Sequence, residues 1–275
     1  MSEHGKIYWH EAFFEALQLE LHQYKDALEF QKEHRLSEEA LRMDVLVIKK
    51  NKDVRIEKNI GRIFKKYNIF EYKSESDSFS LWDYNKILGY AFLYSAFESI
   101  PLSDITISIA LTIYPRELVK FLENERGLML KYLDNGIYYI EDEIIPIQIL
   151  ESKNLSTDSN LFLRNLRSNL SAKDMLSIIH SYNEQKPLNE KNVYLDRLGR
   201  ANHDAFLEAM NMMTEGLKDL ILEGAEKYGW LDDIIKQAGE KSRAEMAKKM
   251  LLDGEPIEKV ARWTELSIES VAALL

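Results

Sequence analysis

The chain has 275 residues, of which 45% are hydrophobic and 30% charged, and its formal net charge is −10. This composition is typical of a globular protein, and the length is enough for one large domain or two. The absence of cysteine excludes disulfides, thiolate zinc sites and a cysteine nucleophile. No run approaches the roughly 18 apolar residues of a membrane span, and residues 1–6 do not begin a secretory signal. We therefore expect a cytoplasmic protein without a membrane partner.

The first 155 residues are predicted to alternate between helices and strands. Apolar residues at helical spacing predict helices over 8–27, 60–67, 81–97 and 115–125. Alternating or continuous apolar runs predict strands over 28–33, 42–49, 68–73 and 105–113, and a hairpin over 136–150. This order predicts an α/β core.

Beyond residue 155 the strand pattern disappears and helices are predicted. They cover residues 158–168, 172–183 and 199–225, so residues 156–227 are expected to form a helical region. A long helix is then predicted from 231 to 252, followed by two short ones over 257–265 and 267–275 with helix-turn-helix-like spacing. The last of these has no Arg, Lys, Asn or Gln with which to read DNA, so residues 228–275 are more consistent with packing or homo-oligomer formation.

Three ionisable residues in two of the predicted strands are the strongest candidates for chemistry. Asp44 lies in the strand over 42–49, and Glu71 and Lys73 lie in the strand over 68–73. Because side chains alternate along a strand, Glu71 and Lys73 should share one face, with Phe70 and Tyr72 on the other. If the two strands are neighbours, two carboxylates and a lysine converge. This set can hold Mg²⁺ or Mn²⁺ and support phosphodiester hydrolysis.

Positive charge is concentrated around these residues in an otherwise acidic chain. Residues 42–73 contain ten basic and four acidic side chains, a balance of +6. Binding of DNA is driven by phosphate neutralisation, so this stretch is the expected contact surface. Its candidate contacts include Lys49, Lys50, Arg62, Lys65 and Lys66. The alternative is a solvated, lysine-rich sheet edge, which protects against aggregation.

The arrangement of Asp44 and Glu71-Tyr72-Lys73 resembles the PD-(D/E)XK nuclease superfamily, in particular the bacterial transposase-like or recombination-promoting nucleases. The resemblance extends through residues 42–50, 70–74 and 81–90, although Met43 stands where the pattern has proline. It implies a restriction-endonuclease-like core over residues 1–155, in which a mixed sheet is flanked by helices, and the activity of a metal-dependent DNA endonuclease.

The same resemblance implies further site residues. The backbone carbonyl of Tyr72 would be an additional metal ligand, and Glu20 on the first helix a third carboxylate. Tyr84, Lys86 and Tyr90 on the helix over 81–97 would be candidates for phosphate contact.

Two other interpretations remain open from the residues alone. Lys73 is equally suited to an ion pair with Asp44 or Glu71 that holds a sheet edge. The chain would then be a catalytically inactive nuclease-like module for DNA binding or assembly, or an accessory protein of a mobile element.

Overall fold

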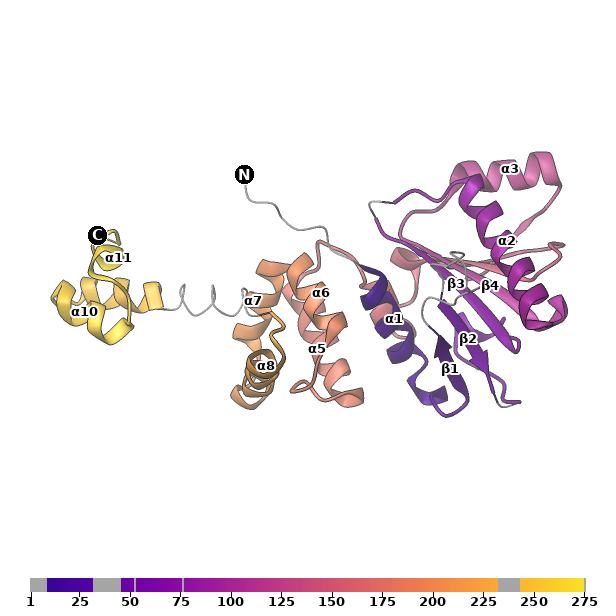
Figure 1. Cartoon of the computed structure of the whole chain (residues 1–275). Helices are drawn as coiled ribbons and strands as arrows, with labels where there is room; N and C mark the ends of the chain where they lie inside the picture. The colour runs from indigo at the N-terminus through magenta and orange to yellow at the C-terminus, as the bar shows by residue number, and fades with distance from the viewer. Residues whose placement is uncertain (1–8, 32–45, 52, 76, 232–242, 275) are drawn as a thin grey trace.

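The computed structural model describes residues 9–31, 46–51, 53–75, 77–231 and 243–274 (Figure 1). Within these residues one mixed sheet of seven strands forms in the order β1-β2-β3-β4-β7-β6-β5. The fold is therefore α/β with a mixed sheet, as the sequence predicts. The strands are β1 (Leu28–Gln31), β2 (Leu46–Lys50), β3 (Tyr67–Lys73), β4 (Ile105–Leu111), β5 (Leu130–Asp134), β6 (Ile137–Ile140) and β7 (Ile147–Glu151).

Helices cover the sheet and make up most of the chain after it. Those associated with the strands are α1 (Trp9–Glu20), α2 (Leu81–Glu98) and α3 (Arg116–Arg126). The helical region contains α4 (Leu161–Arg164), α5 (Ala172–Gln185), α6 (Val193–Ala201), α7 (His203–Met212) and α8 (Glu215–Tyr228). Residues 243–252 are helical, and α10 (Ile257–Thr264) and α11 (Ile268–Ala272) follow. No helix in the described part of the chain is long and apolar enough to cross a membrane.

The centre of the sheet is made by three strands that run in parallel, β3, β4 and β7. β1, β2 and β3 pair antiparallel, and β4 pairs with β3 in parallel after the chain has crossed through α2. All seven residues of β4 are buried, which explains its mainly apolar sequence, and its two polar residues, Thr106 and Ser108, form buried hydrogen bonds with Asn68 and Gln148. β7 pairs in parallel with the other side of β4, and β6 and β5 extend the sheet antiparallel.

Two separate hydrophobic cores form on the two faces of this sheet. Phe70 and Tyr72 of β3 pack into the core that contains α1, whereas Ile69 packs into the core that contains α2. Figure 1 shows α1 and α2 on opposite sides of the sheet. The predicted alternation along β3 is therefore confirmed, and Glu71 and Lys73 belong to the α2 side.

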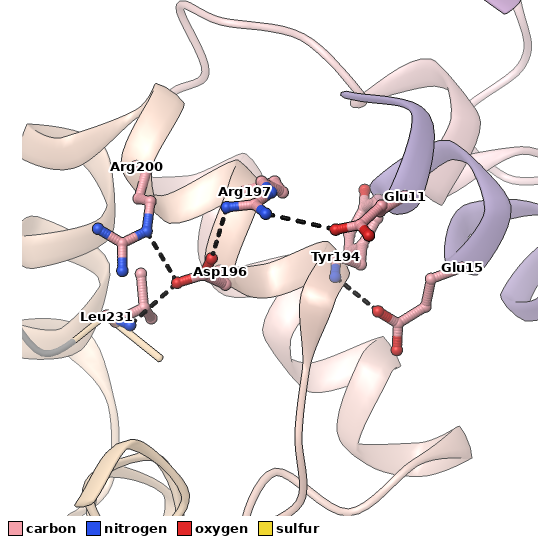
Figure 2. Close-up of polar contacts among 7 residues, drawn as sticks. All are labelled: Glu11, Glu15, Tyr194, Asp196, Arg197, Arg200 and Leu231. Atoms are coloured by element: carbon pink, nitrogen blue, oxygen red, sulfur yellow. Dashed lines mark hydrogen bonds and ion pairs between the residues drawn. The ribbon is translucent and has the colours of Figure 1, made fainter. Parts of the chain in front are cut away.

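The helical region shares the hydrophobic core of α1. Apolar residues of α4 to α8 pack in the same cluster as those of α1, as do Trp230 and Leu231 after α8. Buried Glu15 of α1 accepts hydrogen bonds from Tyr194 N (2.6 Å) and the Tyr182 hydroxyl (2.6 Å). Leu231 N donates to Asp196 Oδ1 at 3.0 Å. Figure 2 shows this hydrogen bond together with the one from Tyr194 N to Glu15. The boundary predicted at residue 228 thus falls before two residues that belong to the main core.

Several elements differ from their predicted extents. α1 ends at Glu20, and only the 3-10 turn Asn59–Gly61 forms within the helix predicted over 60–67. Here Asn68 bonds through its side chain to both N and O of Lys65, which closes a turn in place of a helix. The helix predicted over 199–225 is divided into α6, α7 and α8. Asn202 separates the first two, because its side chain accepts from Leu170 N and donates to Leu198 O.

The C-terminal residues form a small core of their own. The two short helices predicted over 257–265 and 267–275 are present as α10 and α11. The long helix predicted over 231–252 is described only from residue 243 onward. Its Ala247 packs against Val260, Ala261 and Val271 in a cluster distinct from the two sheet cores.

Candidate active site

The predicted residues Glu71 and Lys73 lie side by side at the carboxyl end of β3. Lys73 Nζ is 3.6 Å from Glu71 Oε1 and 3.0 Å from Asp83 Oδ1 at the start of α2. Their side chains are 16% (Glu71), 24% (Lys73) and 25% (Asp83) exposed, so solvent reaches all three. Asp44 lies outside the described residues, and its meeting with Glu71 remains a prediction.

Asp83 is held in place by the capping box of α2. Ser80 is the N-cap residue, and its hydroxyl accepts a hydrogen bond from Asp83 N. Asp83 Oδ2 in turn accepts from Ser80 N at 2.8 Å and from the Ser80 hydroxyl at 2.6 Å. The second oxygen, Oδ1, is left to bind Lys73. The start of α2 therefore fixes the position of the Lys73 ammonium group.

The surroundings shift the pKa values of these groups in opposite directions. Burial raises the pKa of Glu71 from its ordinary 4.5 to about 7, although the charges of Lys73 and Lys86 act to lower it. For Lys73, burial alone would lower the pKa, but the bonds to Asp83 and Glu71 outweigh it and raise the pKa. Burial works against ionisation of Asp83 too, yet its bonds to Ser80 and Lys73 lower the pKa. Lys73 therefore stays protonated at neutral pH, whereas the neighbouring Glu71 carboxyl group is only partly ionised.

This donor set is suited to a hard divalent cation. Glu71 offers a carboxylate whose Oε1 is 3.6 Å from Lys73 Nζ, whereas both oxygens of Asp83 already accept shorter contacts. A bound cation would stabilise ionised Glu71 in place of the solvent that burial removes. Among the described residues no three Asp, Glu or His side chains gather to hold a metal, so a complete site requires a ligand such as Asp44.

Tyr72 anchors β3 between these two side chains. Its ring stacks on Phe13 of α1 with centroids 4.5 Å apart, and burial raises the pKa of its hydroxyl. The ring holds the strand from the α1 side while Glu71 and Lys73 extend from the other side. Its backbone carbonyl remains a predicted metal ligand.

Glu20 is not brought together with Glu71. It accepts hydrogen bonds from Phe162 N (2.7 Å) and Leu163 N (3.0 Å) in α4 and pairs with Lys58 Nζ at 2.7 Å. It belongs to the α1 side of the sheet, and burial raises its pKa. These contacts give Glu20 a role in binding the start of α4 to α1.

Most of the predicted DNA-contacting residues lie away from Glu71. Lys49 pairs with Tyr67 in the sheet and Lys50 N donates to Lys66 O, so these lysines and Lys65 are at the amino end of β3. Tyr67 and Glu71 are four positions apart in β3, which corresponds to about 13 Å along the strand. Arg62 is exposed and donates to Glu57 O. These basic side chains therefore do not surround Glu71 and Lys73.

Of the α2 candidates, only Lys86 is placed to influence Glu71. Its charge acts on the Glu71 carboxylate, and its Nζ is 5.3 Å from the centre of the Tyr90 ring. Tyr84 is fully buried and donates to Glu143 Oε2 at 2.6 Å, so it is a core residue. Sequence reasoning missed Asp83, although the Ser-x-x-Asp spacing before an apolar run is a recognisable capping signal.

Comparisons with known proteins return nothing for this chain. No family model, curated protein or solved structure matches it.

Proposed function

We propose that the chain is a metal-dependent DNA endonuclease that hydrolyses phosphodiester bonds at the carboxyl end of β3. The observation that supports this most is the pairing of Glu71 and Lys73 on one face of a central strand. That strand runs between antiparallel β2 and parallel β4. The order of α1, three antiparallel strands, α2 and a parallel strand also agrees with the core that the family resemblance implies.

Each residue of the site has a distinct role in this proposal. Glu71 holds Mg²⁺ or Mn²⁺, together with Asp44 and the Tyr72 carbonyl. When bound, such an ion polarises the phosphate and lowers the pKa of a coordinated water. Lys73 stabilises negative charge that develops on the phosphate oxygens. Its raised pKa makes it a poor general base, so we assign it an electrostatic role.

Asp83 is a positioning residue in this arrangement. It keeps Lys73 protonated and fixed beside Glu71 through a contact of 3.0 Å. Since Asp83 is bound to Ser80 as well, the start of α2 and the end of β3 act as one rigid support. Such support is what a preorganised charge requires.

Cleavage of supercoiled plasmid with Mg²⁺ or Mn²⁺, with EDTA as the metal-free control, tests the proposal. We expect Asp44→Ala, Glu71→Gln and Lys73→Ala each to abolish cleavage. Lys120→Ala, which removes an exposed lysine paired with Glu117 on α3, should cleave as the wild type does. If folded wild-type protein cuts with neither metal, or Lys73→Ala cuts normally, the proposal is wrong.

A second function is favoured by the closed charge network itself. Lys73 forms ion pairs with both Glu71 and Asp83, an arrangement that would also suit a structural role in a nuclease-like fold that binds DNA without cutting it. This alternative predicts salt-sensitive DNA binding that EDTA does not weaken, with no turnover.

A further inference from the structure

The first turn of α2 exposes a large aromatic side chain beside the candidate active site. Trp82 is 78% exposed, while a Trp side chain in a folded protein is normally mostly buried. It directly precedes Asp83, whose carboxylate binds Lys73. Trp82 is therefore one residue from the Asp83–Lys73 contact, and its exposed indole ring is not part of the hydrophobic core.

Positive charge accompanies this ring on the same helix face. Lys86 is four residues after Trp82, which places the two side chains next to each other on the helix surface. Asp83, which follows Trp82 directly, is 3.0 Å from Lys73, so this turn of the helix borders the site, and the charge of Lys86 acts on the Glu71 carboxylate. One turn further on, Gly89 has open space around its α-carbon, and no side chain there obstructs the face.

An exposed aromatic ring next to a lysine is the combination that binds single-stranded nucleic acid. Each unstacked base offers a flat face for stacking, and the cation meets the backbone phosphate. In a duplex the base faces are already stacked on one another and are not accessible. Trp9 and Phe13 of α1 are buried in the core and cannot stack on a base. Among the large hydrophobic side chains that are exposed, Trp82 (78%) is more exposed than the other Trp, Trp263 (65%), which lies in α10.

We propose that Trp82 is a stacking platform for an unpaired base, so that the substrate of the Glu71–Lys73 site is single-stranded DNA or a single-stranded end. This inference deepens the proposed endonuclease function and rests on it. Lys86 contacts the phosphate that follows the stacked base, which leads the strand toward Glu71.

Binding in EDTA separates this inference from cleavage. Anisotropy of a fluorescein-labelled 12-nucleotide oligothymidine should show a Kd about 5- to 150-fold weaker for Trp82→Ala, the range that loss of one stacked base gives. Trp82→Phe retains an aromatic face and should lose less. Trp263→Ala is the matched control, because Trp263 is 65% exposed but lies in α10, and it should bind as the wild type does.

Each outcome distinguishes the inference from the proposed function. Wild-type affinity for oligothymidine in Trp82→Ala, or an equal loss on a 12-base-pair duplex, overturns the stacking role while plasmid cleavage still tests the nuclease. The inference also fails if Trp82→Ala changes only self-association, since the ring would then be a protein contact. Binding that depends on Trp82 without any cleavage would support stacking and refute the endonuclease.

Discussion

Replacing Glu71 with glutamine distinguishes a functional carboxylate from a structural ion pair. Burial raises the folded-state pKa of Glu71 from 4.5 to about 7. The folded protein therefore holds a proton that the unfolded chain has released between these two pH values. The contribution of the Glu71 carboxyl to the free energy of unfolding is therefore fully present below about pH 4.5 and is lost as the pH rises to about 7. Glutamine resembles the protonated acid and carries no such penalty.

The magnitude follows from the size of the shift. A change of one pKa unit corresponds to about 1.4 kcal/mol, so the shift of Glu71 amounts to about 3 kcal/mol. We expect Glu71→Gln to raise the free energy of unfolding by up to about 3 kcal/mol at pH 8 and by almost nothing at pH 4.5. Urea unfolding followed by circular dichroism at both pH values, in EDTA, measures this difference.

Asp83→Asn provides a control of opposite sign. The pKa of Asp83 is lowered in the folded state, so its contribution is present above its unfolded pKa and is lost as pH falls. Because the variant also weakens the capping box, we expect it to lose about 1 kcal/mol at neutral pH. If Glu71→Gln is likewise less stable than the wild type at pH 8, Glu71 is a structural partner of Lys73 and the reasoning is refuted.

Three further predictions concern the parts that support the site. Glu20→Ala should lower the free energy of unfolding by about 3 kcal/mol, because it leaves the largely buried Lys58 unpaired. Below its melting temperature, this variant should cleave plasmid as the wild type does. Loss of cleavage in the folded variant would show that Glu20 belongs to the metal site. Phe13→Ala should cost about 3–4 kcal/mol in urea unfolding, since it removes the ring stacked on Tyr72, and a loss under 1 kcal/mol would contradict the anchoring of β3. By calorimetry, a chain that ends at residue 231 should have the melting temperature of the main core in the full protein. A chain that ends at residue 227 loses the core residue Leu231 and should melt several degrees lower. Equal melting temperatures for the two chains would show that Leu231 is dispensable.

The strand that carries the site was predictable because it depends on local pattern alone. A period of two places Glu71 and Lys73 on one face whatever the rest of the chain does. The β-branched sequence of β4 likewise indicates a strand that is buried on both faces. Both interpretations are confirmed, with strand ends that differ by one or two residues from those predicted.

The partners of the site were not predictable, because they depend on packing between distant elements. Asp83 meets Lys73 only because α2 begins directly beside the end of β3. Glu20 resembled a ligand as a lone acid on the first helix, but its partners Phe162 and Leu163 are more than 140 residues away in sequence. Clustered lysines in sequence also gave no indication that β2 and β3 would carry them to the end opposite Glu71.

The hydrogen bonds of Glu15 determine when part of this protein can fold during synthesis on the ribosome. Tyr194 N, which Glu15 binds, lies 179 residues further along the chain. At ordinary synthesis rates of about 5–20 residues per second, Tyr194 is synthesised about 10 to 40 s after Glu15. The hydrogen bond between them cannot form before then. During that time the apolar residues of α1 that pack against the helical region in the folded protein have no such partner. The strand bearing Glu71 and Lys73 is therefore synthesised well before the helical region that packs on α1, on the other side of the sheet.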